Sequence, residues 1–229
     1  MQKQQMAAMF DSIAPRYDFL NTFLSFGIHV GWRKKAISLL KKDAPKRILD
    51  IATGTADFAI ESLSLKPDSV VGVDLSEGML RLGQAKLAKK NLGSKIQLIQ
   101  GDSENLPFEK DSFDAVTVGF GVRNFENLNK GLTSICRVLR PGGILVILEF
   151  SKPTNSLIKS LYRFYFGYLT PFIGRLFSKD SLAYSYLPES VYAFPDGQDF
   201  LDLMKKNGFS DNKQLSLTFN IASIYVGKK

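Results

Sequence analysis

Residues 47–57 read Arg-Ile-Leu-Asp-Ile-Ala-Thr-Gly-Thr-Ala-Asp. The first part of this stretch, residues 47–52, is a short and nearly all-apolar run, typical of a strand buried on both faces of a parallel sheet. Gly54 marks a tight turn, and a helical pattern begins after it. The stretch therefore indicates the first strand, turn and helix of an α/β fold.

Four further runs of the same texture follow along the chain, at residues 69–74, 96–100, 113–118 and 144–150. Helical patterns or loops lie between them, and Leu128–Leu139 predicts a helix before the last run. This alternation predicts a doubly wound, Rossmann-like α/β fold with a parallel sheet.

The end of the chain departs from this alternation. A helix is expected over Gln198–Asn207, followed by strands over Gln214–Phe219 and Ala222–Val226. Only Asn220 and Ile221 separate these two strands, so we expect an antiparallel hairpin. The complete prediction is a seven-stranded sheet that ends in this hairpin.

The 229 residues are expected to form a single domain with additions. Residues 1–45 are predicted to form an N-terminal helical cap, and residues 46–151 the core that binds a cofactor. Residues 152–190 are rich in aromatic residues, leucine and proline, and are predicted as a helical insertion after the fifth strand. Residues 191–229 hold the last helix and the hairpin.

Composition excludes several kinds of protein. The single cysteine, Cys136, excludes a disulfide framework, and the single histidine, His29, excludes a histidine-rich metal site, so we expect no metal. No stretch reaches the ~20 apolar residues that span a bilayer, and the N-terminus lacks the apolar core of a signal peptide, which predicts a cytoplasmic protein. The 30 basic and 22 acidic residues give a net charge of +8. This charge favours binding to an anionic partner surface; the alternative is a solvated basic surface without a partner.

Polar residues follow three predicted strands at what would be one edge of the sheet. The turn at Gly54 and the helix N-terminus after it suit a small carboxylate, or form an ordinary turn without a ligand. Asp74 suits the two hydroxyls of a ribose, or caps the next helix in place of Ser76. Asp102 suits an adenine amino group, with a neighbouring N–H from Ser103, or is a turn residue.

In spatial order these three sites match S-adenosylmethionine, which carries a carboxylate, an ammonium, a ribose and an adenine but no phosphate. The dinucleotide fingerprint G-x-G-x-x-G is absent, because Ala56 and Ala59 stand where glycines would be needed. A nicotinamide-dependent oxidoreductase is therefore disfavoured. A regulatory module that binds the cofactor without chemistry stays open.

Several longer motifs are similar to those of a known family. They are Phe10–Asn21, Leu24–Arg33, Gly119–Phe125 (Gly-Phe-Gly-Val-Arg-Asn-Phe), Arg137–Gly143 and Tyr184–Ser190. With them, the sequence resembles the class I S-adenosylmethionine-dependent methyltransferases over most of its length. More narrowly, it resembles the ubiquinone/menaquinone-biosynthesis C-methyltransferases, for which Gly119–Phe125 and Tyr184–Ser190 are the most restrictive stretches.

This resemblance implies C-methylation of demethylmenaquinol in menaquinone biosynthesis, with S-adenosylmethionine as the cofactor. It also implies a set of cofactor contacts: Thr55, Asp74, Asp102, Ser103, Gly54 and Asp50. Family members often have glycines where this chain has Thr53 and Ala56. The branch that also accepts ubiquinone precursors typically has a serine at position 119, so Gly119 favours menaquinone alone, with a related quinol as the alternative.

Methyl transfer to carbon requires a nucleophilic ring carbon, which a quinol supplies when it loses a hydroxyl proton. Arg123 is expected to stabilise the phenolate with its fixed charge or to orient a water; the alternative is a local pair with Glu126. His29 has a suitable intrinsic pKa to accept the proton, or is a packing residue. Asn124 is expected to contact the substrate or to cap a helix.

Three tyrosines and one apolar stretch complete the predicted site. Tyr17, on the first helix, is expected to contact the cofactor, while Tyr184 and Tyr186 line the quinone pocket or are core aromatics. Residues 157–177 have apolar side chains at helical spacing with basic residues among them. We expect these residues to form one of three things: a lid that admits a prenylated quinol from a membrane surface, a core helix, or a dimer contact.

Nucleic acid is the main rival substrate, because a nucleic-acid methyltransferase would share the cofactor and the positive charge. The amino-methylating kind usually has an Asn/Asp-Pro-Pro-aromatic tetrapeptide after the fourth strand, where this chain has Gly119–Asn124. The cysteine-nucleophile kind needs a thiol there, but Cys136 lies inside the helix before Pro141. The expected partners are instead a prenylated demethylmenaquinol, transiently the inner face of the cell membrane, and a second copy of the chain as a homodimer.

Overall fold

The computed structural model describes residues 2–153, 155–156, 158–160 and 182–229. Its centre is a seven-stranded sheet in the order β3-β2-β1-β4-β5-β7-β6. The strands are β1 (Arg47–Ile51), β2 (Ser69–Asp74), β3 (Ile96–Gln100), β4 (Phe113–Gly119), β5 (Leu139–Phe150), β6 (Ser210–Leu217) and β7 (Ala222–Lys228). The first five pair in parallel, whereas β7 is antiparallel to both β5 and β6. The predicted seven-stranded sheet with a terminal antiparallel hairpin is confirmed.

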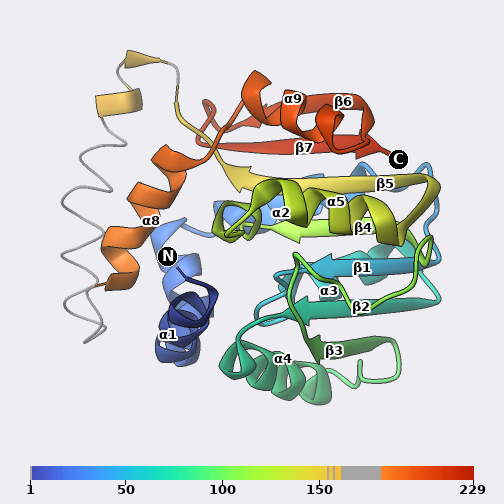
Figure 1. The fold of residues 1–229 in the computed structure, drawn as a ribbon. Helices are drawn as coiled ribbons and strands as arrows, with labels where there is room; N and C mark the ends of the chain where they lie inside the picture. Colours follow the sequence, from blue (N-terminus) through green and yellow to red (C-terminus); the bar gives the residue numbers. More distant parts are fainter. Residues whose placement is uncertain (1, 154, 157, 161–181) are drawn as a thin grey trace.

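Helices cover both faces of this sheet (Figure 1). Helices α2 (Ile28–Ser38), α3 (Asp57–Ser62) and α4 (Glu77–Lys89) bury side chains in one hydrophobic cluster, and α5 (Leu128–Val138) and α9 (Gln198–Lys206) bury theirs in the other. Successive residues of a strand face opposite clusters, as Ile48 and Leu49 of β1 do. Both faces of the strand are therefore buried, which explains its nearly continuous apolar sequence.

Helices α1 (Lys3–Leu24) and α8 (Leu182–Ala193) lie across the carboxyl ends of the parallel strands (Figure 1). Side chains of α1 bond directly to residues that follow these strands. Asp11 accepts the hydroxyl of Ser76 at 2.5 Å, and Lys3 donates to Asp102 at 2.8 Å. The helical cap predicted from the N-terminal sequence therefore covers the edge of the sheet where the predicted binding residues lie.

The structure moves several predicted boundaries, among them the start of β6, which lies at Ser210 rather than at Gln214. Strand β5 begins at Leu139, five residues before the predicted run at 144, because Leu139 already pairs with Phe113 through an irregular register. The hairpin loop is longer than predicted, since Leu217 pairs with Ala222 and leaves four residues between the strands. Residues 218, 219 and 220 all have positive φ (44°, 55° and 65°), a conformation that cannot continue a strand.

The predicted insertion is described only in part. Helix α8 is described over Leu182–Ala193, which starts inside residues 152–190 and continues three residues past that boundary. Most of the stretch 157–177, for which we predicted a lid, a core helix or a dimer contact, lies outside the described residues. Within the described part of the chain, no helix combines the length and the apolar character needed to cross a membrane.

Candidate functional site

Two cavities meet at the carboxyl ends of the parallel strands. The first encloses about 760 Å³, including its opening to solvent, under helix α1. A cavity of this size suits a small-molecule ligand. Its polar lining residues are Lys3, Tyr17, Asp74, Ser76, Asp102, Ser103, Glu104 and Asn124. The cavity therefore gathers the residues that the sequence predicted at the ends of two different strands.

Asp74 is the last residue of β2 and lines the first cavity. One carboxylate oxygen accepts the backbone N–H of Gly54 at 2.7 Å, and the other accepts that of Ser76 at 2.9 Å. Burial raises the pKa of Asp74, and these two N–H groups oppose the rise. Helix α4 is capped by Ser76, whose Oγ accepts the N–H of Met79 at 3.1 Å. The alternative prediction that Asp74 caps this helix is therefore wrong.

Asp102 and Ser103 line the same cavity beyond β3. Asp102 accepts the N–H of Glu104 at 2.9 Å, the local bond of a turn residue, and also the ammonium of Lys3 at 2.8 Å. Lys3 lies 2.9 Å from the carboxylate of Glu104 as well. Burial alone would lower the pKa of Lys3, but the two carboxylates together raise it. Helix α1 thus places a cation on the carboxylate predicted to receive the adenine amino group.

Gly54 lines both cavities, and the side chain of Asp50 anchors the loop that carries Gly54. Gly54 has a φ of +54°, and a Cβ built on it would meet no atom within 4 Å, so the space above the loop is open. The fully buried Asp50 carboxylate accepts the hydroxyls of Thr53 at 2.5 Å and Thr117 at 2.7 Å. Burial raises the pKa of Asp50 to about 7, against the effect of these bonds. Asp50 lines neither of the two cavities, and its bond to Thr53 holds the loop that carries Gly54.

The second cavity encloses about 560 Å³, including its opening, beneath the junction of α1 and α2. It shares five lining residues with the first: Tyr17, Ala52, Gly54, Gly119 and Phe120. Its own polar lining residues are Asp18, Asn21, His29, Arg33, Thr53, Thr55 and Asp57. The two cavities are therefore neighbouring parts of one site, with Gly119 and Phe120 of the β4 end between them.

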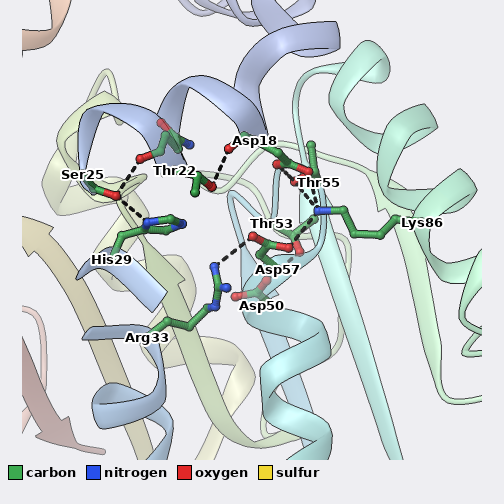
Figure 2. A network of polar contacts seen from close by, with 11 residues as sticks. Asp18, Thr22, Ser25, His29, Arg33, Asp50, Thr53, Thr55, Asp57 and Lys86 are labelled. Atoms are coloured by element: carbon green, nitrogen blue, oxygen red, sulfur yellow. Dashed lines mark hydrogen bonds and ion pairs between the residues drawn. The ribbon is translucent and has the colours of Figure 1, made fainter. Parts of the chain in front are cut away.

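A network of charged groups lies beside the second cavity, which Asp18, Arg33 and Asp57 line. Figure 2 shows how Lys86 joins this network. The ammonium of Lys86 lies 2.7 Å from a carboxylate oxygen of Asp18 and of Asp57, and 3.0 Å from Thr55 Oγ1. Thr55 donates to Asp18 at 2.6 Å, and Arg33 lies 2.9 Å from Asp57. Burial would raise the pKa of Asp57, but Lys86 and Arg33 bring it below its usual value. Thr55, a predicted cofactor contact, is thus hydrogen-bonded to members of a network that contains two cations and two carboxylates.

His29 lines the second cavity as a neutral imidazole. Burial and the charge of Arg33 lower its pKa, against the pull of two nearby carboxylates. Its Nδ1 lies 2.6 Å from Ser25 Oγ, and the Ser25 hydroxyl donates its one proton to the carbonyl of Asn21 at 2.6 Å. In the tautomer in which Ser25 donates to Asn21, Nδ1 carries the proton of the ring and Nε2 is the basic nitrogen.

Tyr17 lines both cavities, as expected for a cofactor contact on the cap. Burial raises the pKa of its phenol, whereas a bond with Asn21 and the charge of Arg123 lower it. Its ring also packs edge-on against Phe10, with centroids 6.2 Å apart. Tyr17 therefore stays a neutral, partly apolar group at the junction of the two cavities.

Arg123 forms a buried ion pair at the edge of the site. Its guanidinium lies 2.7 Å from Glu149 Oε1, with 7% and 0% of the two side chains exposed. It also donates to the carbonyl of Phe120 at 2.5 Å and to Ser190 Oγ at 3.2 Å. The alternative local pair with Glu126 is wrong, because the end of β5 brings Glu149 beside Arg123 instead. Arg123 is not among the residues that line either cavity.

Asn124 lines the first cavity and accepts the hydroxyl of Tyr186 at 3.0 Å. It does not cap α5, since Asn127 fills that position and accepts the N–H of Lys130 at 3.0 Å. The capping alternative for Asn124 is therefore wrong. Tyr186 is half-buried on α8, beside the cavity wall. Tyr184 lies on the same helix, but its side chain is outside what the structure describes.

Several charged residues of the site escaped the sequence analysis, among them Lys3, Arg33, Asp57, Lys86, Glu104 and Glu149. A signal existed for Glu149, because it is a charged residue inside an otherwise apolar strand run. Asp57 follows the Gly54 loop directly, and Arg33 closes one of the motifs noted above. Lys3 and Lys86 carried no local signal, since surface lysines on helices are common.

The described residues fit S-adenosylmethionine. Asp74 and Asp102 present carboxylates to a cavity of suitable size, in the order expected for a ribose and an adenine. The open space above Gly54 gives room for the rest of the molecule. In addition, Arg33 Nε is buried and finds no hydrogen-bond partner in the described part of the chain.

Known proteins are similar to this chain over nearly its whole length. Residues 1–229 match the ubiE/COQ5 methyltransferase family. The chain is 45% identical over 227 residues to the demethylmenaquinone methyltransferase of Bacteroides fragilis, covering 99% of this chain and 93% of that protein. It is 46% identical over 228 residues to the ubiquinone/menaquinone biosynthesis C-methyltransferase UbiE of Geobacter sulfurreducens, covering 99% and 89%. Its fold is similar to that of a SAM-dependent methyltransferase of Thermotoga maritima, a possible histamine N-methyltransferase, with a TM-score of 0.66 at 20% identity over 98% of this chain and 99% of that one.

Proposed function

Because the chain belongs to the ubiE/COQ5 methyltransferase family, whose members transfer methyl groups from S-adenosylmethionine, we propose that it methylates a ring carbon of demethylmenaquinol. The observation that carries the proposal is the meeting of the two cavities at Gly119 and Phe120, the end of β4. One cavity presents the cofactor-binding carboxylates, and the other presents a neutral imidazole. A methyl donor held in the first cavity and a proton acceptor in the second would therefore face the same point at the end of β4.

When bound, S-adenosylmethionine supplies an electrophilic methyl group on a positively charged sulfur. The chain's part is to hold the cofactor: Asp74 accepts from the ribose hydroxyls and Asp102 from the adenine amino group, with Ser103 beside it. Gly54 and Tyr17 line the path between the cavities. Asp50 holds the loop that carries Gly54, because its carboxylate accepts the hydroxyl of Thr53.

Aromatic side chains at the ends of β4 and β5 suit a quinol ring. Phe120 packs against Phe150 with ring centroids 4.6 Å apart, and against Trp32 with centroids 6.3 Å apart. Such a wall excludes water, which favours phenolate attack over side reactions. Asn124 and Tyr186, joined by their hydrogen bond, are proposed as polar contacts to the ring, with Tyr184 on the same helix.

The proton balance assigns one role to His29. A quinol hydroxyl would give its proton to Nε2 of His29, and the electron pair of the phenolate would form the new ring carbon–methyl bond as the bond between that methyl group and the cofactor sulfur breaks, which leaves S-adenosylhomocysteine. The ring carbon would then lose its hydrogen as a proton to restore aromaticity, and the phenolate oxygen would take back the proton that His29 holds. One methyl group enters and one proton leaves. Arg123, held by Glu149, is proposed to stabilise the phenolate with its charge. A phenol has a pKa near 10, so both a base and a nearby cation assist the first step.

Gly119 supports demethylmenaquinol as the main acceptor, with a related quinol as the alternative. A Cβ at this position would lie 2.5 Å from the ring of Phe58, so even a serine would force that ring to move. The prenyl tail of such a substrate resides in a membrane, so we also propose transient contact with an anionic membrane surface, consistent with the net charge of +8. That the chain forms a homodimer is proposed from its sequence alone.

The test is transfer of a labelled methyl group from S-adenosylmethionine to chemically reduced demethylmenaquinone in detergent. The oxidised quinone, a ubiquinone-pathway quinol and bulk RNA are run beside it. Product from the reduced demethylmenaquinone alone is expected. Equal product from the oxidised form would remove the phenolate mechanism, and product only from RNA would replace the proposed substrate.

A further inference from the structure

Exposed hydrophobic side chains gather around the turn between α1 and α2. In the described part of the chain six large hydrophobic side chains are exposed, and four of them lie within residues 19–28: Phe19, Phe23, Phe26 and Ile28. Single exposed hydrophobic residues are ordinary on a protein surface, whereas a contiguous group marks an interaction surface. Asn21 and His29 of the same segment line the second cavity. The segment therefore presents polar side chains to the cavity and apolar ones to the solvent.

The other two exposed hydrophobic residues, Tyr192 and Phe219, belong to the same edge of the sheet. Phe219 is in the β6–β7 loop, which lies at the carboxyl end of β5 because the first residue of β7 pairs with the last of β5. Its neighbour Thr218 accepts the indole N–H of Trp32, on α2, at 2.8 Å. Tyr192 is on α8, which lies across this edge with α1 (Figure 1). All six residues are thus on elements at the carboxyl edge.

Two of these aromatic residues have a backbone conformation that disfavours them. Phe26 has a φ of +50° and Phe219 a φ of +55°, and they are the most exposed of the six, at 80% and 75%. Glycine or asparagine usually fills this left-handed region, because a bulky side chain crowds the backbone there. Neither phenylalanine gains burial in return, so packing within the chain does not explain either one. A strained and exposed aromatic residue in a turn indicates contact with something outside the chain.

Basic residues flank this apolar group. Residues 12–35 hold four basic residues and one acidic residue, Asp18, whose charge is balanced by Lys86. Among the basic residues, Lys34 and Lys35 are exposed on α2, about two helical turns from Ile28. The segment therefore complements a negatively charged surface. Apolar side chains that enter hydrocarbon, with cations at the level of the headgroups, are typical of proteins that lie on an anionic bilayer.

We propose that the α1–α2 turn and the β6–β7 loop form a docking surface for an anionic lipid bilayer, with Phe26 and Phe219 inserted among the lipids. This inference deepens the proposed membrane contact and rests on the proposed function only for the identity of the substrate. In this orientation the second cavity lies next to the docked turn. A quinol then brings its ring to His29 and Phe120 while its prenyl tail stays in the bilayer, which avoids the transfer of apolar surface into water.

Two arguments favour a bilayer over a second copy of the chain as the partner of this surface. Phe26 and Phe219 are in turns and are almost fully exposed. A fluid bilayer accepts protruding side chains without a matching surface, whereas a protein–protein interface requires close shape complementarity. A symmetric dimer would also bring the same positively charged segment of each copy together, and like charges across an interface repel.

The test measures binding of the full chain to sedimented vesicles of phosphatidylglycerol and phosphatidylcholine, without quinol or cofactor. The first variant combines Phe26→Asn with Phe219→Asn. Asparagine tolerates a positive φ, so the melting temperature is expected to stay at least as high as that of the wild type. Each lost phenylalanine is expected to weaken vesicle binding roughly tenfold, because its apolar area no longer enters the bilayer.

A second variant tests where the charge acts. Lys34→Gln combined with Lys35→Gln is expected to weaken binding roughly fivefold for each lysine. The matched control combines Lys66→Gln with Lys95→Gln, which removes two exposed lysines that precede β2 and β3 at the opposite edge of the sheet. The control is expected to bind like the wild type. Vesicles of phosphatidylcholine alone, or high salt, are expected to weaken binding of the wild type.

The proposal is overturned if the wild type does not bind the anionic vesicles, or if the Phe26 and Phe219 double variant binds them as the wild type does. Equal losses from the two lysine pairs would also overturn it, because the attraction would then depend on net charge and not on this surface. If the phenylalanine variant lost self-association in sedimentation velocity and kept vesicle binding, the surface would belong to a dimer. No measurement here needs methyl transfer, so failure of the proposed acceptor would leave these results unaffected.

Discussion

The ammonium of Lys3 lies 2.8 Å from the carboxylate of Asp102, and 99 residues of sequence separate the two. Lys3 is in the first turn of α1, and Asp102 follows β3. The pair bridges the cap and the core at the point where we expect the adenine amino group to bind. If the adenine binds there as proposed, Lys3 and the cofactor compete for one carboxylate.

We expect Lys3→Met to tighten S-adenosylmethionine binding, because the cofactor no longer displaces a cation from Asp102. The pair is partly exposed, so its worth is at most about 1 kcal/mol, and the gain is at most roughly fivefold. Calorimetry at low and high salt measures the effect, which should shrink as salt increases. Weaker binding by the variant would mean that Lys3 holds the cofactor rather than competing with it.

Asp74→Asn is expected to weaken cofactor binding by about 2 kcal/mol or more. The substitution keeps the shape of the side chain but removes the charge that accepts the N–H groups of Gly54 and Ser76 and that we propose accepts the ribose hydroxyls. Calorimetry is the measurement, and Glu77→Gln, an exposed carboxylate three residues later, is the control. Unchanged affinity in a folded Asp74→Asn protein would remove Asp74 from the cofactor site.

Arg123→Met is expected to lower turnover without changing cofactor affinity, because Arg123 lines neither cavity yet donates to the carbonyl of Phe120. The single variant leaves Glu149 buried without a counter-charge, which costs roughly 3–5 kcal/mol of stability.

The double variant Arg123→Met, Glu149→Leu removes both charges and should recover much of that stability in urea unfolding. It thereby separates folding from chemistry. Wild-type turnover by the double variant would exclude Arg123 from the reaction.

The pH dependence of stability should carry a contribution from Asp50. Its folded-state pKa of about 7 lies above the ordinary value of 3.8, so the folded chain holds a proton that the unfolded chain releases between these values. Stability from this group is therefore fully present below about pH 4 and is lost as the pH rises to about 7, with a slope of at most ~1.4 kcal/mol per pH unit. Asp50→Asn cannot titrate, so the difference in unfolding free energy between it and the wild type should change across this window. A constant difference would contradict the raised pKa.

Gly119→Ala is expected to destabilise the fold by roughly 1–3 kcal/mol, because the added methyl group would lie 2.5 Å from the ring of Phe58. Phe58→Leu in the same chain makes room and should recover part of the loss. Thermal unfolding of the two single variants and the double variant measures the coupling. Additive losses would show that the two positions do not compete for space.

The sequence alone was enough to predict the sheet, its terminal hairpin, the helical cap and the residues at the strand ends. These features depend on local patterns: runs such as 69–74 are apolar because both faces of a central strand are buried, and Gly54 marks a turn that only a few residues can make. The carboxyl ends of parallel strands share one edge, so Asp74 and Asp102 could be placed together without coordinates.

Tertiary structure decided which distant group each of these residues meets. Lys3 with Asp102, Arg123 with Glu149, and Lys86 with Asp18 are pairs between elements that periodicity cannot relate. Each depends on how helices pack against the sheet and on which strands are neighbours, and a charged side chain with a long, flexible stem gives no sign of its partner in its own segment. Local sequence therefore determined where the site lies, and packing across the carboxyl edge determined which charges meet there.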